Sequence, residues 1–165
     1  MNVIKDLNIK DLPDFYPLLG EIECGDLFDC DNTDHLDWLK RKMSLYIQMN
    51  AKYWGIYLKE TPIAIVALLV DQGPKGIPYF GKKAEILEIG VYKEFRRSGH
   101  ASLLLRHAEH YAKEKGVYCL YMSTYAKDSG VIHFYGKNGF VPVATLPDVH
   151  GPKEEGLVIM RKRLA

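Results

Sequence analysis

The sequence predicts an α/β fold with a mixed sheet, built as one domain over residues 1–165. Segments with strand character alternate with segments in which apolar residues recur at helical spacing. A strand, a helix and a second strand follow one another over residues 84–125, and this order is a βαβ crossover with parallel strands. A hairpin over residues 52–72 adds antiparallel pairing. A chain of this length can bury a core without disulfides or a structural metal.

The composition is that of an ordinary soluble protein. Hydrophobic residues make up 47% of the chain, and 22 basic residues nearly balance 21 acidic ones, so no nucleic-acid or membrane partner is expected. The amino-terminal residues lack the apolar core of a signal peptide, and a cytoplasmic location is expected. The three cysteines lack a CxxC spacing, so we expect reduced thiols and no metal site.

The first half of the chain is expected to hold a strand, two helices and the hairpin. The strand is expected over residues 2–9, and the first helix over residues 10–23. Asp34 is the expected N-cap of the next helix, residues 35–50. Its apolar residues recur at steps of three and four, as one helix face requires: Leu36, Leu39, Met43 and Ile47. The hairpin turn is expected at KETP, residues 59–62.

The second half is expected to begin with a loop and then to complete the sheet. The loop is expected over residues 73–83. The crossover consists of a strand, a helix and a strand, over residues 84–92, 101–116 and 117–125. A short helix and two closing strands are expected over residues 130–138, 139–144 and 156–164.

The turn before the crossover helix is the first candidate for chemistry. Arg96, Arg97, Ser98 and Gly99 precede a helix whose first N–H groups lack partners and lie at the positive end of the helix dipole. Gly99 lets the backbone approach a bulky anion, and small Ala101 keeps the next turn open. The alternative is a plain helix start, in which Ser98 caps the helix and both arginines are solvated. The Walker pattern GxxxxGK[ST] and the GxGxxG fingerprint are both absent.

Two motifs follow one another in a fixed order, RRSGHA at residues 96–101 and HFYGKNGF at residues 133–140. The first resembles the [RQ]xxGx[GA] signature of the GCN5-related N-acetyltransferase (GNAT) superfamily. The second resembles the superfamily's aromatic-Tyr-x-x-x-Gly-Phe segment, and the order of elements over residues 2–163 is similar too. The resemblance implies a single-domain GNAT-like fold, with a mostly antiparallel mixed sheet, a central parallel βαβ crossover and helices on both faces.

The resemblance further implies that acetyl-CoA binds at the signature turn. Its pyrophosphate would lie on the backbone amides of Arg96, Arg97, Ser98, Gly99, His100, Ala101 and Ser102. The end of the preceding strand would hold the pantetheine arm and the thioester, by position at Ile89, Gly90 and Val91. A glycine within a strand marks a bulge or a close backbone approach, although Gly90 could equally pack against an aromatic neighbour.

One cofactor position departs from the superfamily pattern. The superfamily often has an asparagine that contacts the cofactor, seven residues before the tyrosine of the aromatic-Tyr-x-x-x-Gly-Phe segment. That tyrosine is Tyr135 here, and this chain has Asp128 at the asparagine position. A carboxylate accepts hydrogen bonds but cannot donate one unless it is protonated, so this contact with the cofactor is in doubt.

The resemblance implies that an amine attacks the thioester directly in a ternary complex. A base must take a proton from the ammonium, and an acid must protonate the departing thiolate. Glu85 and Glu88 are the candidate bases, with a water chain as the alternative. Glu85 ranks first, because it stands eleven residues before Arg96, as does the catalytic glutamate of histone-acetylating members. Strand alternation puts Glu85 and Glu88 on opposite faces. Tyr135 matches the superfamily tyrosine that serves as the acid.

The resemblance leaves the acceptor open. Six carboxylates between residues 21 and 34 hint at a cationic acceptor such as a polyamine, an aminoglycoside or a lysine side chain, or else they form a solvated loop. A small-molecule amine is expected rather than a protein, and a homodimer fits the superfamily. The rival functions are a non-catalytic acyl-CoA-binding regulatory module and a protein lysine or amino-terminal acetyltransferase.

Overall fold

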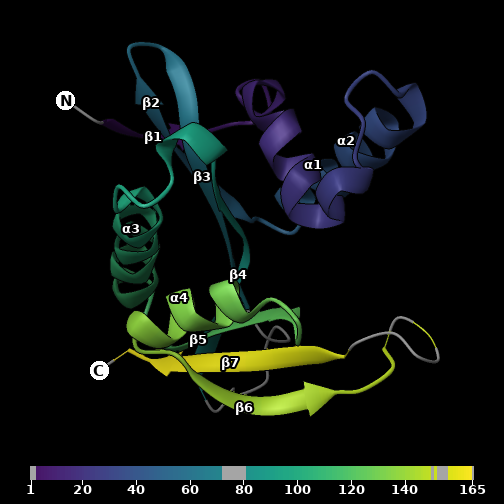
Figure 1. Ribbon diagram of the computed structural model, residues 1–165. Helices are drawn as coiled ribbons and strands as arrows, with labels where there is room; N and C mark the ends of the chain where they lie inside the picture. The colour runs from purple at the N-terminus through teal and green to yellow at the C-terminus, as the bar shows by residue number, and fades with distance from the viewer. Residues whose placement is uncertain (1–2, 72–80, 150, 152–155, 165) are drawn as a thin grey trace. The chain divides into compact units, whose positions relative to one another are not determined.

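The computed structural model describes residues 3–71, 81–149, 151 and 156–164, and Figure 1 shows its elements. The chain falls into two compact units. The first unit comprises Met1–Val70 and Ile86–Tyr111, and the second comprises Asp71–Glu85 and Ala112–Ala165. Strand β4 (Lys82–Val91) and helix α3 (His100–Glu114) each run from one unit into the other. The expectation of one domain over the whole chain stays a prediction.

The first unit contains the predicted hairpin and two helices. Besides its parts of β4 and α3, it holds strands β1 (Val3–Leu7), β2 (Lys52–Leu58) and β3 (Thr61–Val70), helices α1 (Tyr16–Cys24) and α2 (Thr33–Gln48), and the 3-10 helices η1 (Leu12–Phe15), η2 (Gly25–Leu27) and η3 (Lys93–Phe95). The hairpin β2–β3 is confirmed as antiparallel, and β1 pairs antiparallel with β2.

Two details of the helices differ from the prediction. The helix expected over residues 10–23 is divided into η1 and α1, because Pro17 has no N–H with which to continue one helix through this point. The N-cap of α2 is Asn32 and not Asp34. The Asn32 side chain accepts hydrogen bonds from the backbone N–H groups of Asp34 and His35, at 3.0 and 3.4 Å, so it satisfies donors that would otherwise lack partners.

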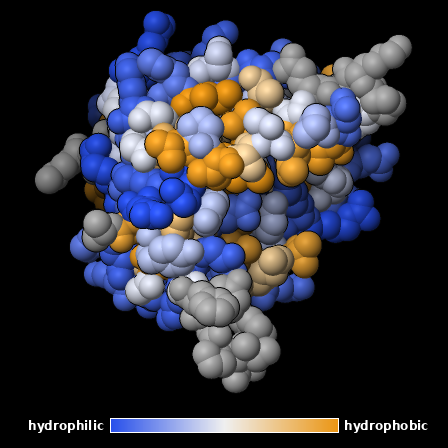
Figure 2. Space-filling view, turned by 90° about the horizontal axis from the view of Figure 1, so that it is seen from below, coloured by the Kyte–Doolittle hydropathy of each residue, from blue (hydrophilic) through white to orange (hydrophobic). Residues whose placement is uncertain are grey.

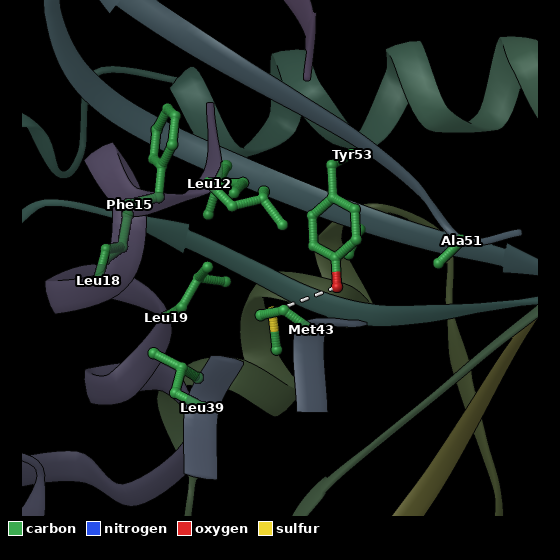
Figure 3. Packing of buried hydrophobic residues seen from close by; sticks show 10 residues of the cluster. Leu12, Phe15, Leu18, Leu19, Leu39, Met43, Ala51 and Tyr53 are labelled. Carbon is green, nitrogen blue, oxygen red and sulfur yellow. Dashed lines mark hydrogen bonds between the residues drawn. The ribbon is translucent and has the colours of Figure 1, made fainter. Parts of the chain in front are cut away.

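A hydrophobic core in the first unit packs η1, α1 and α2 against β2 and β3 (Figure 3). Its buried members are Leu12, Phe15, Leu18, Leu19, Leu39, Met43, Ala51, Tyr53, Ile65 and Ala67. The Tyr53 hydroxyl donates a hydrogen bond to Met43 Sδ at 3.3 Å, which links β2 to α2 inside this core (Figure 3). Fully burying a side chain such as Leu39 contributes about 1.5–3 kcal/mol, so this core fixes α1 and α2 against the strands.

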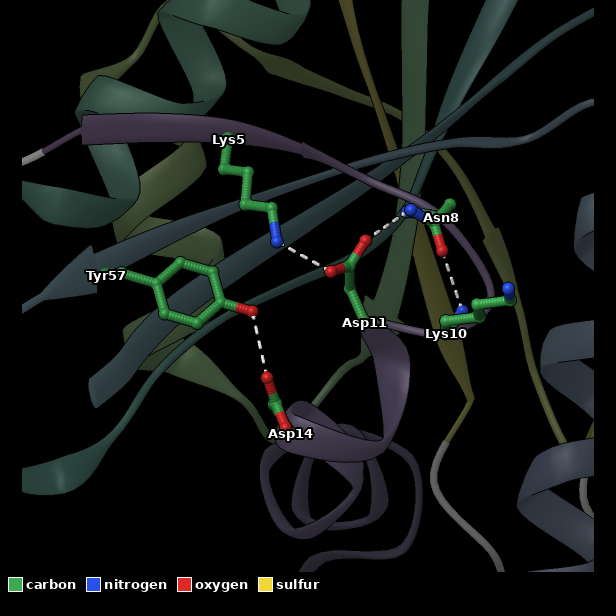
Figure 4. Close-up of polar contacts among 6 residues, drawn as sticks. All are labelled: Lys5, Asn8, Lys10, Asp11, Asp14 and Tyr57. Atoms are coloured by element: carbon green, nitrogen blue, oxygen red, sulfur yellow. Dashed lines mark hydrogen bonds and ion pairs between the residues drawn. The ribbon is translucent and has the colours of Figure 1, made fainter. Parts of the chain in front are cut away.

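Polar contacts fix the connection from β1 to η1 (Figure 4). Asp11 accepts hydrogen bonds from the Lys5 ammonium at 2.6 Å and from the Asn8 backbone N–H at 2.9 Å. The Tyr57 hydroxyl on β2 donates to Asp14 Oδ2 at 3.2 Å. These contacts hold the start of η1 beside β1 and β2, and so they set where α1 begins.

The second unit carries the parallel pairing that the crossover predicted. Its further elements are β5 (Val117–Tyr125), α4 (Ser129–Lys137), β6 (Val141–Leu146) and β7 (Leu157–Arg163). β4 pairs parallel with β5, from Lys82 opposite Val117 to Glu85 opposite Tyr121, which confirms the β4–α3–β5 crossover. β5 with β7 and β6 with β7 are antiparallel. The hydrogen-bonded order is β1-β2-β3-β4-β5-β7-β6, so the sheet is mixed as predicted.

The loop expected over residues 73–83 is only partly testable. Residues 73–80 lie outside the described residues, and Lys82 and Lys83 already belong to β4, so the loop ends earlier than predicted. Strand β6 is exposed along its whole length, and hydrophobic surface is visible on the side where β6 and β7 lie (Figure 2). Within the described part of the chain, no helix combines the length and the apolar character that crossing a membrane requires.

Candidate active site

The turn between β4 and α3 presents its backbone amides outward. Arg97 and Gly99 both adopt positive φ, 62° and 81°, and this geometry turns successive N–H groups toward one side. Among the described residues, the N–H groups of Arg97, Ser98, Gly99, Ala101 and Ser102 have no hydrogen-bond acceptor. A Cβ added at Gly99 would meet no atom within 4 Å. The turn therefore combines donors without partners with open space above the glycine, which is the local structure that a phosphate requires.

Arg96 and Ser98 differ from the alternative of a plain helix start, in which Ser98 caps the helix and both arginines are solvated. Arg96 Nε donates to the carbonyl of Val91 at 2.9 Å, and Arg96 Nη2 donates to Glu21 Oε1 on α1 at 2.5 Å. This guanidinium is therefore engaged in holding the turn against β4 and α1. The Ser98 hydroxyl donates to the Arg96 carbonyl at 3.4 Å, so Ser98 does not cap α3. Backbone amides, rather than Arg96, are the donors that the turn leaves available.

The last six residues of β4 have one open edge. The pairing of β4 with β5 ends at Glu85, and Tyr92, just past the strand, donates its N–H to Ile63 of β3 at 3.0 Å. From Ile86 to Val91, β4 thus keeps β3 as neighbour on one side and has no described partner strand on the other. An unpaired strand edge offers backbone N–H and C=O groups to an extended ligand.

Gly90 lies on this segment, and its small size is required by packing. A Cβ at Gly90 would lie 2.5 Å from Ile22 Cδ1, 3.0 Å from Ile22 Cγ1 and 3.2 Å from Leu18 Cδ1. The close approach is therefore to aliphatic side chains of α1. The neighbour is thus not the aromatic side chain of one alternative, and the role of Gly90 toward the cofactor stays a prediction.

The alternation of side chains along β4 is interrupted beside Gly90. Leu87 packs against the α1–α2 core, and Gly90, three residues later, faces Leu18 of that same core. A regular strand would point two residues at an odd separation to opposite faces. An extra residue in the strand, as in a β-bulge, restores a common face. Burial alternates from Ala84 to Glu88 and becomes irregular only beyond Glu88, so the prediction that Glu85 and Glu88 face opposite sides stands.

Glu88 is the buried acidic residue of this region. Its exposure is 2%, and as an ionised group it has no hydrogen-bond donor for either carboxylate oxygen among the described residues. Burial, followed by the nearby Glu23 carboxyl on α1, raises the pKa of Glu88 well above its ordinary value, while the charge of Lys42 opposes this shift.

Glu23 and Lys42 complete the surroundings of Glu88. Glu23 is one of the six carboxylates noted between residues 21 and 34, whereas the sequence did not single out Lys42. Lys42 on α2 forms an ion pair with Glu23, and its ammonium lies 5.5 Å from the ring centroids of both Trp38 and Tyr46. The side chains of Lys42 and Glu23 are 24% and 16% exposed. The spacing of Trp38, Lys42 and Tyr46 at four-residue steps was a readable signal of one helix face, but nothing in the sequence linked that face to β4.

Glu85 has a different environment from Glu88. It is the last residue of β4 that pairs with β5, and it belongs to the second unit. Glu85 is exposed, and partial desolvation raises the pKa of its carboxyl. No charged partner contributes to this shift, so Glu85 lacks the grouping of charges found around Glu88.

Tyr135 and Asp128 lie in the second unit, at α4. Tyr135 is 2% exposed, and its ring packs edge-on against Phe134 and Phe140 with centroids 5.1 and 5.0 Å apart. Burial raises the pKa of its hydroxyl, so the hydroxyl keeps its proton at neutral pH. Asp128 is the N-cap residue of α4 and accepts a hydrogen bond from the Thr124 hydroxyl at 3.4 Å. Its carboxylate is therefore held by β5.

The sequence matches a known protein family over most of its length. The model of the acetyltransferase (GNAT) family matches residues 12–140, which is more than half of the chain. The chain belongs to this family, as the two motifs indicated. Family members use acetyl-CoA, and the chain is an acetyl-CoA-dependent N-acetyltransferase. The open turn and the open strand edge fit that cofactor, because the turn supplies amide donors for phosphates and the edge supplies backbone groups for an extended arm.

Solved structures share the fold at low sequence identity. The ribosomal-protein-S18-alanine N-acetyltransferase of Escherichia coli has a TM-score of 0.77 at 18% identity, over 100% of this chain and 95% of that one. The PaiA N-acetyltransferase of Thermoplasma acidophilum, solved with coenzyme A, has a TM-score of 0.69 at 22% identity, over 99% of both chains. The IAA acetyltransferase of Bacillus cereus has a TM-score of 0.71 at 19% identity, over 99% of this chain and 100% of that one. No curated protein matches the sequence.

Proposed function

We propose that this N-acetyltransferase acetylates a primary amine, with small-molecule amines as its expected acceptors, and that Glu88 takes the proton from the acceptor's ammonium. The observation that carries the proposal is the state of Glu88. A carboxylate that is 2% exposed and lacks any described donor is costly to keep ionised. An ammonium is the donor that it lacks, and Glu88 directly precedes Ile89, at the open edge of β4.

The residues that would hold the cofactor follow from the same region. The amides of Arg97, Ser98, Gly99, Ala101 and Ser102 would bind the pyrophosphate at the start of α3. The open edge of β4 at Ile89, Gly90 and Val91 would pair with the pantetheine arm. When bound, acetyl-CoA supplies the acetyl thioester that the amine attacks in a ternary complex.

Two side chains would move the protons. An amine must be neutral to act as a nucleophile, and a base is effective when its pKa lies near the working pH. The raised pKa of Glu88 brings it toward that range, and this supports Glu88 over the exposed Glu85. Tyr135 would protonate the departing thiolate, because burial keeps its hydroxyl protonated at neutral pH.

The test measures thiol release from acetyl-CoA with a panel of polyamines, aminoglycosides, amino acids and peptides with free amino termini. We expect turnover with at least one small amine and a loss of kcat of roughly 100-fold or more in Glu88→Gln, as is typical of a missing general base. Glu85→Gln is the matched control and should retain most of the activity. Turnover with peptides alone would refute the small-molecule acceptor. Tight coenzyme A binding without any turnover would indicate the binding module.

A further inference from the structure

The peptide group between Val91 and Tyr92 is held at both of its polar atoms. Its N–H donates to the Ile63 carbonyl of β3 at 3.0 Å, and its carbonyl accepts a hydrogen bond from Arg96 Nε at 2.9 Å. The two polar groups of a trans peptide point in opposite directions, so this carbonyl points away from β3. It faces the edge of β4 that has no described partner strand. The Arg96 side chain therefore occupies the end of the open edge.

The same guanidinium reaches helix α1 with its other end. Arg96 Nη2 donates to Glu21 Oε1 at 2.5 Å. Helix α1 also packs against β4 at Gly90, where an added Cβ would lie 2.5 Å from Ile22 Cδ1. A guanidinium is planar and presents its donors in a fixed fork. Its contacts with Val91 and Glu21 therefore set one separation between the end of β4 and α1, within the first unit.

Arg96 stands between the two parts of the proposed cofactor site. The turn amides that would bind the pyrophosphate begin at Arg97, and the strand edge that would pair with the pantetheine arm ends at Val91. One ligand gains from both parts only when their spacing fits it, and a site that is already fixed binds more tightly because less freedom is lost on binding. The bridge from Val91 through Arg96 to Glu21 fixes that spacing before the cofactor arrives.

We propose that Arg96 is a positioning residue that fixes the phosphate-binding turn relative to the open edge of β4, and that Glu21 holds Arg96 in this place. The contrasting role is a direct contact between the guanidinium and the phosphates, which the negative charge of Glu21 would oppose. The positioning role goes beyond the acceptor and the base proposed above, and it rests only on the proposed placement of the cofactor. Neither side chain touches a reacting atom.

The two roles predict opposite effects of Glu21→Gln on the affinity for coenzyme A, measured by calorimetry at low salt. If Glu21 holds a positioning arginine, its loss should weaken binding by about 2- to 5-fold, the range expected for an exposed ion pair. If Arg96 contacts the phosphates, the same change removes a negative charge near them, and binding should become tighter. Unchanged or tighter binding in Glu21→Gln overturns the positioning role.

Variants of Arg96 give a second test by the same measurement. Arg96→Met removes both contacts and should weaken coenzyme A binding by about 10-fold or more. Arg96→Lys should lose nearly as much, because one ammonium cannot reproduce the two-point fork, although a lysine serves a phosphate contact well. Adding Glu21→Gln to Arg96→Met should cause no further loss, since Glu21 acts through Arg96. The matched controls Lys40→Met and Asp37→Asn break another exposed ion pair, on α2, and should leave the affinity unchanged.

A shorter ligand separates positioning from direct contact. The compound 3′-phospho-ADP is coenzyme A without its pantetheine arm, so it needs the turn but not the spacing to β4. Arg96→Met should weaken its binding less than that of coenzyme A; equal losses, or wild-type affinity in Arg96→Lys, overturn the positioning role. If Arg96→Met does not fold, the sign of the Glu21→Gln effect still decides. A wrong cofactor placement is recognised separately, because Gly99→Glu would then keep its affinity, and a wrong acceptor is recognised by the turnover panel.

Discussion

Replacing Gly90 by alanine is expected to destabilise the first unit. The added methyl would lie 2.5 Å from Ile22 Cδ1, which is closer than carbon atoms approach in folded proteins. Ile22 Cδ1 is the end of a flexible, half-buried side chain and can move, but Ile22 Cγ1 at 3.0 Å and Leu18 Cδ1 at 3.2 Å leave little space for it. Relief of the contact therefore requires a shift of α1 against β4.

The size of the effect follows from the cost of overpacking a core. An extra methyl group costs about 1–3 kcal/mol, and the mobility of Ile22 places Gly90→Ala in the lower part of that range, about 1–2 kcal/mol. For a chain of this length the Tm should fall by about 2–8 °C. Gly136→Ala, at a helical glycine with no atom within 4 Å of the added Cβ, is the matched control and should be neutral or slightly stabilising.

Urea denaturation of four proteins tests this reasoning: the wild type, Gly90→Ala, Ile22→Val and the double variant. Ile22→Val alone should cost about 0.5–1.5 kcal/mol, because it deletes the Cδ1 methyl. In the double variant that deletion removes the closest clash. Its loss of unfolding free energy should therefore be smaller than the sum of the two single losses, by about 0.5 kcal/mol or more. Additive effects would refute the contact. Full stability of Gly90→Ala with weakened coenzyme A binding would show that the glycine serves the cofactor instead.

Three further predictions concern the turn, the acid and the buried base. Gly99→Glu should abolish coenzyme A binding, measured by calorimetry, because the new carboxylate repels the phosphates. Gly116→Glu is the control, since Gly116 has a similar positive φ and open space after α3, and it should keep the affinity. Equal losses of affinity in both variants would refute the assigned turn. Tyr135→Phe should lower kcat by roughly 10- to 100-fold with coenzyme A affinity unchanged, while Tyr57→Phe keeps the wild-type rate, and a wild-type rate in Tyr135→Phe would remove this acid. Glu88 keeps its proton in the folded state above the unfolded pKa of about 4.3, so its contribution to stability is lost as the pH rises through the raised folded pKa. The stability of Glu88→Gln relative to the wild type, measured in urea from about pH 5 to about pH 9, should therefore increase with pH, and a constant difference would contradict a raised Glu88 pKa.

The elements of the fold were predictable because local patterns specify them. The hairpin β2–β3, the crossover β4–α3–β5 and the closing strands were all found near their predicted positions. Misplaced boundaries have local causes as well. Pro17 divides the first helix, and Asn32 caps α2 in preference to Asp34 because its side chain reaches two backbone donors.

The turn at residues 96–102 shows where local reasoning stops. Its free amides, and the glycine that leaves space above them, follow from a strand that ends just before a helix. The partner of Arg96 does not, because Glu21 stands 75 positions away in the sequence and meets Arg96 only once α1 is packed beside β4. The Arg96 guanidinium thus holds the turn in place.

By itself, the sequence determined the order of elements, the anion-binding turn and the family, since each depends on residues that are near neighbours or on motifs of fixed spacing. Only the tertiary structure decided how Glu88 differs from Glu85, because burial and charge depend on contacts between distant segments. Glu23, Lys42 and Glu88 come together through the packing of α1 and α2 on the sheet.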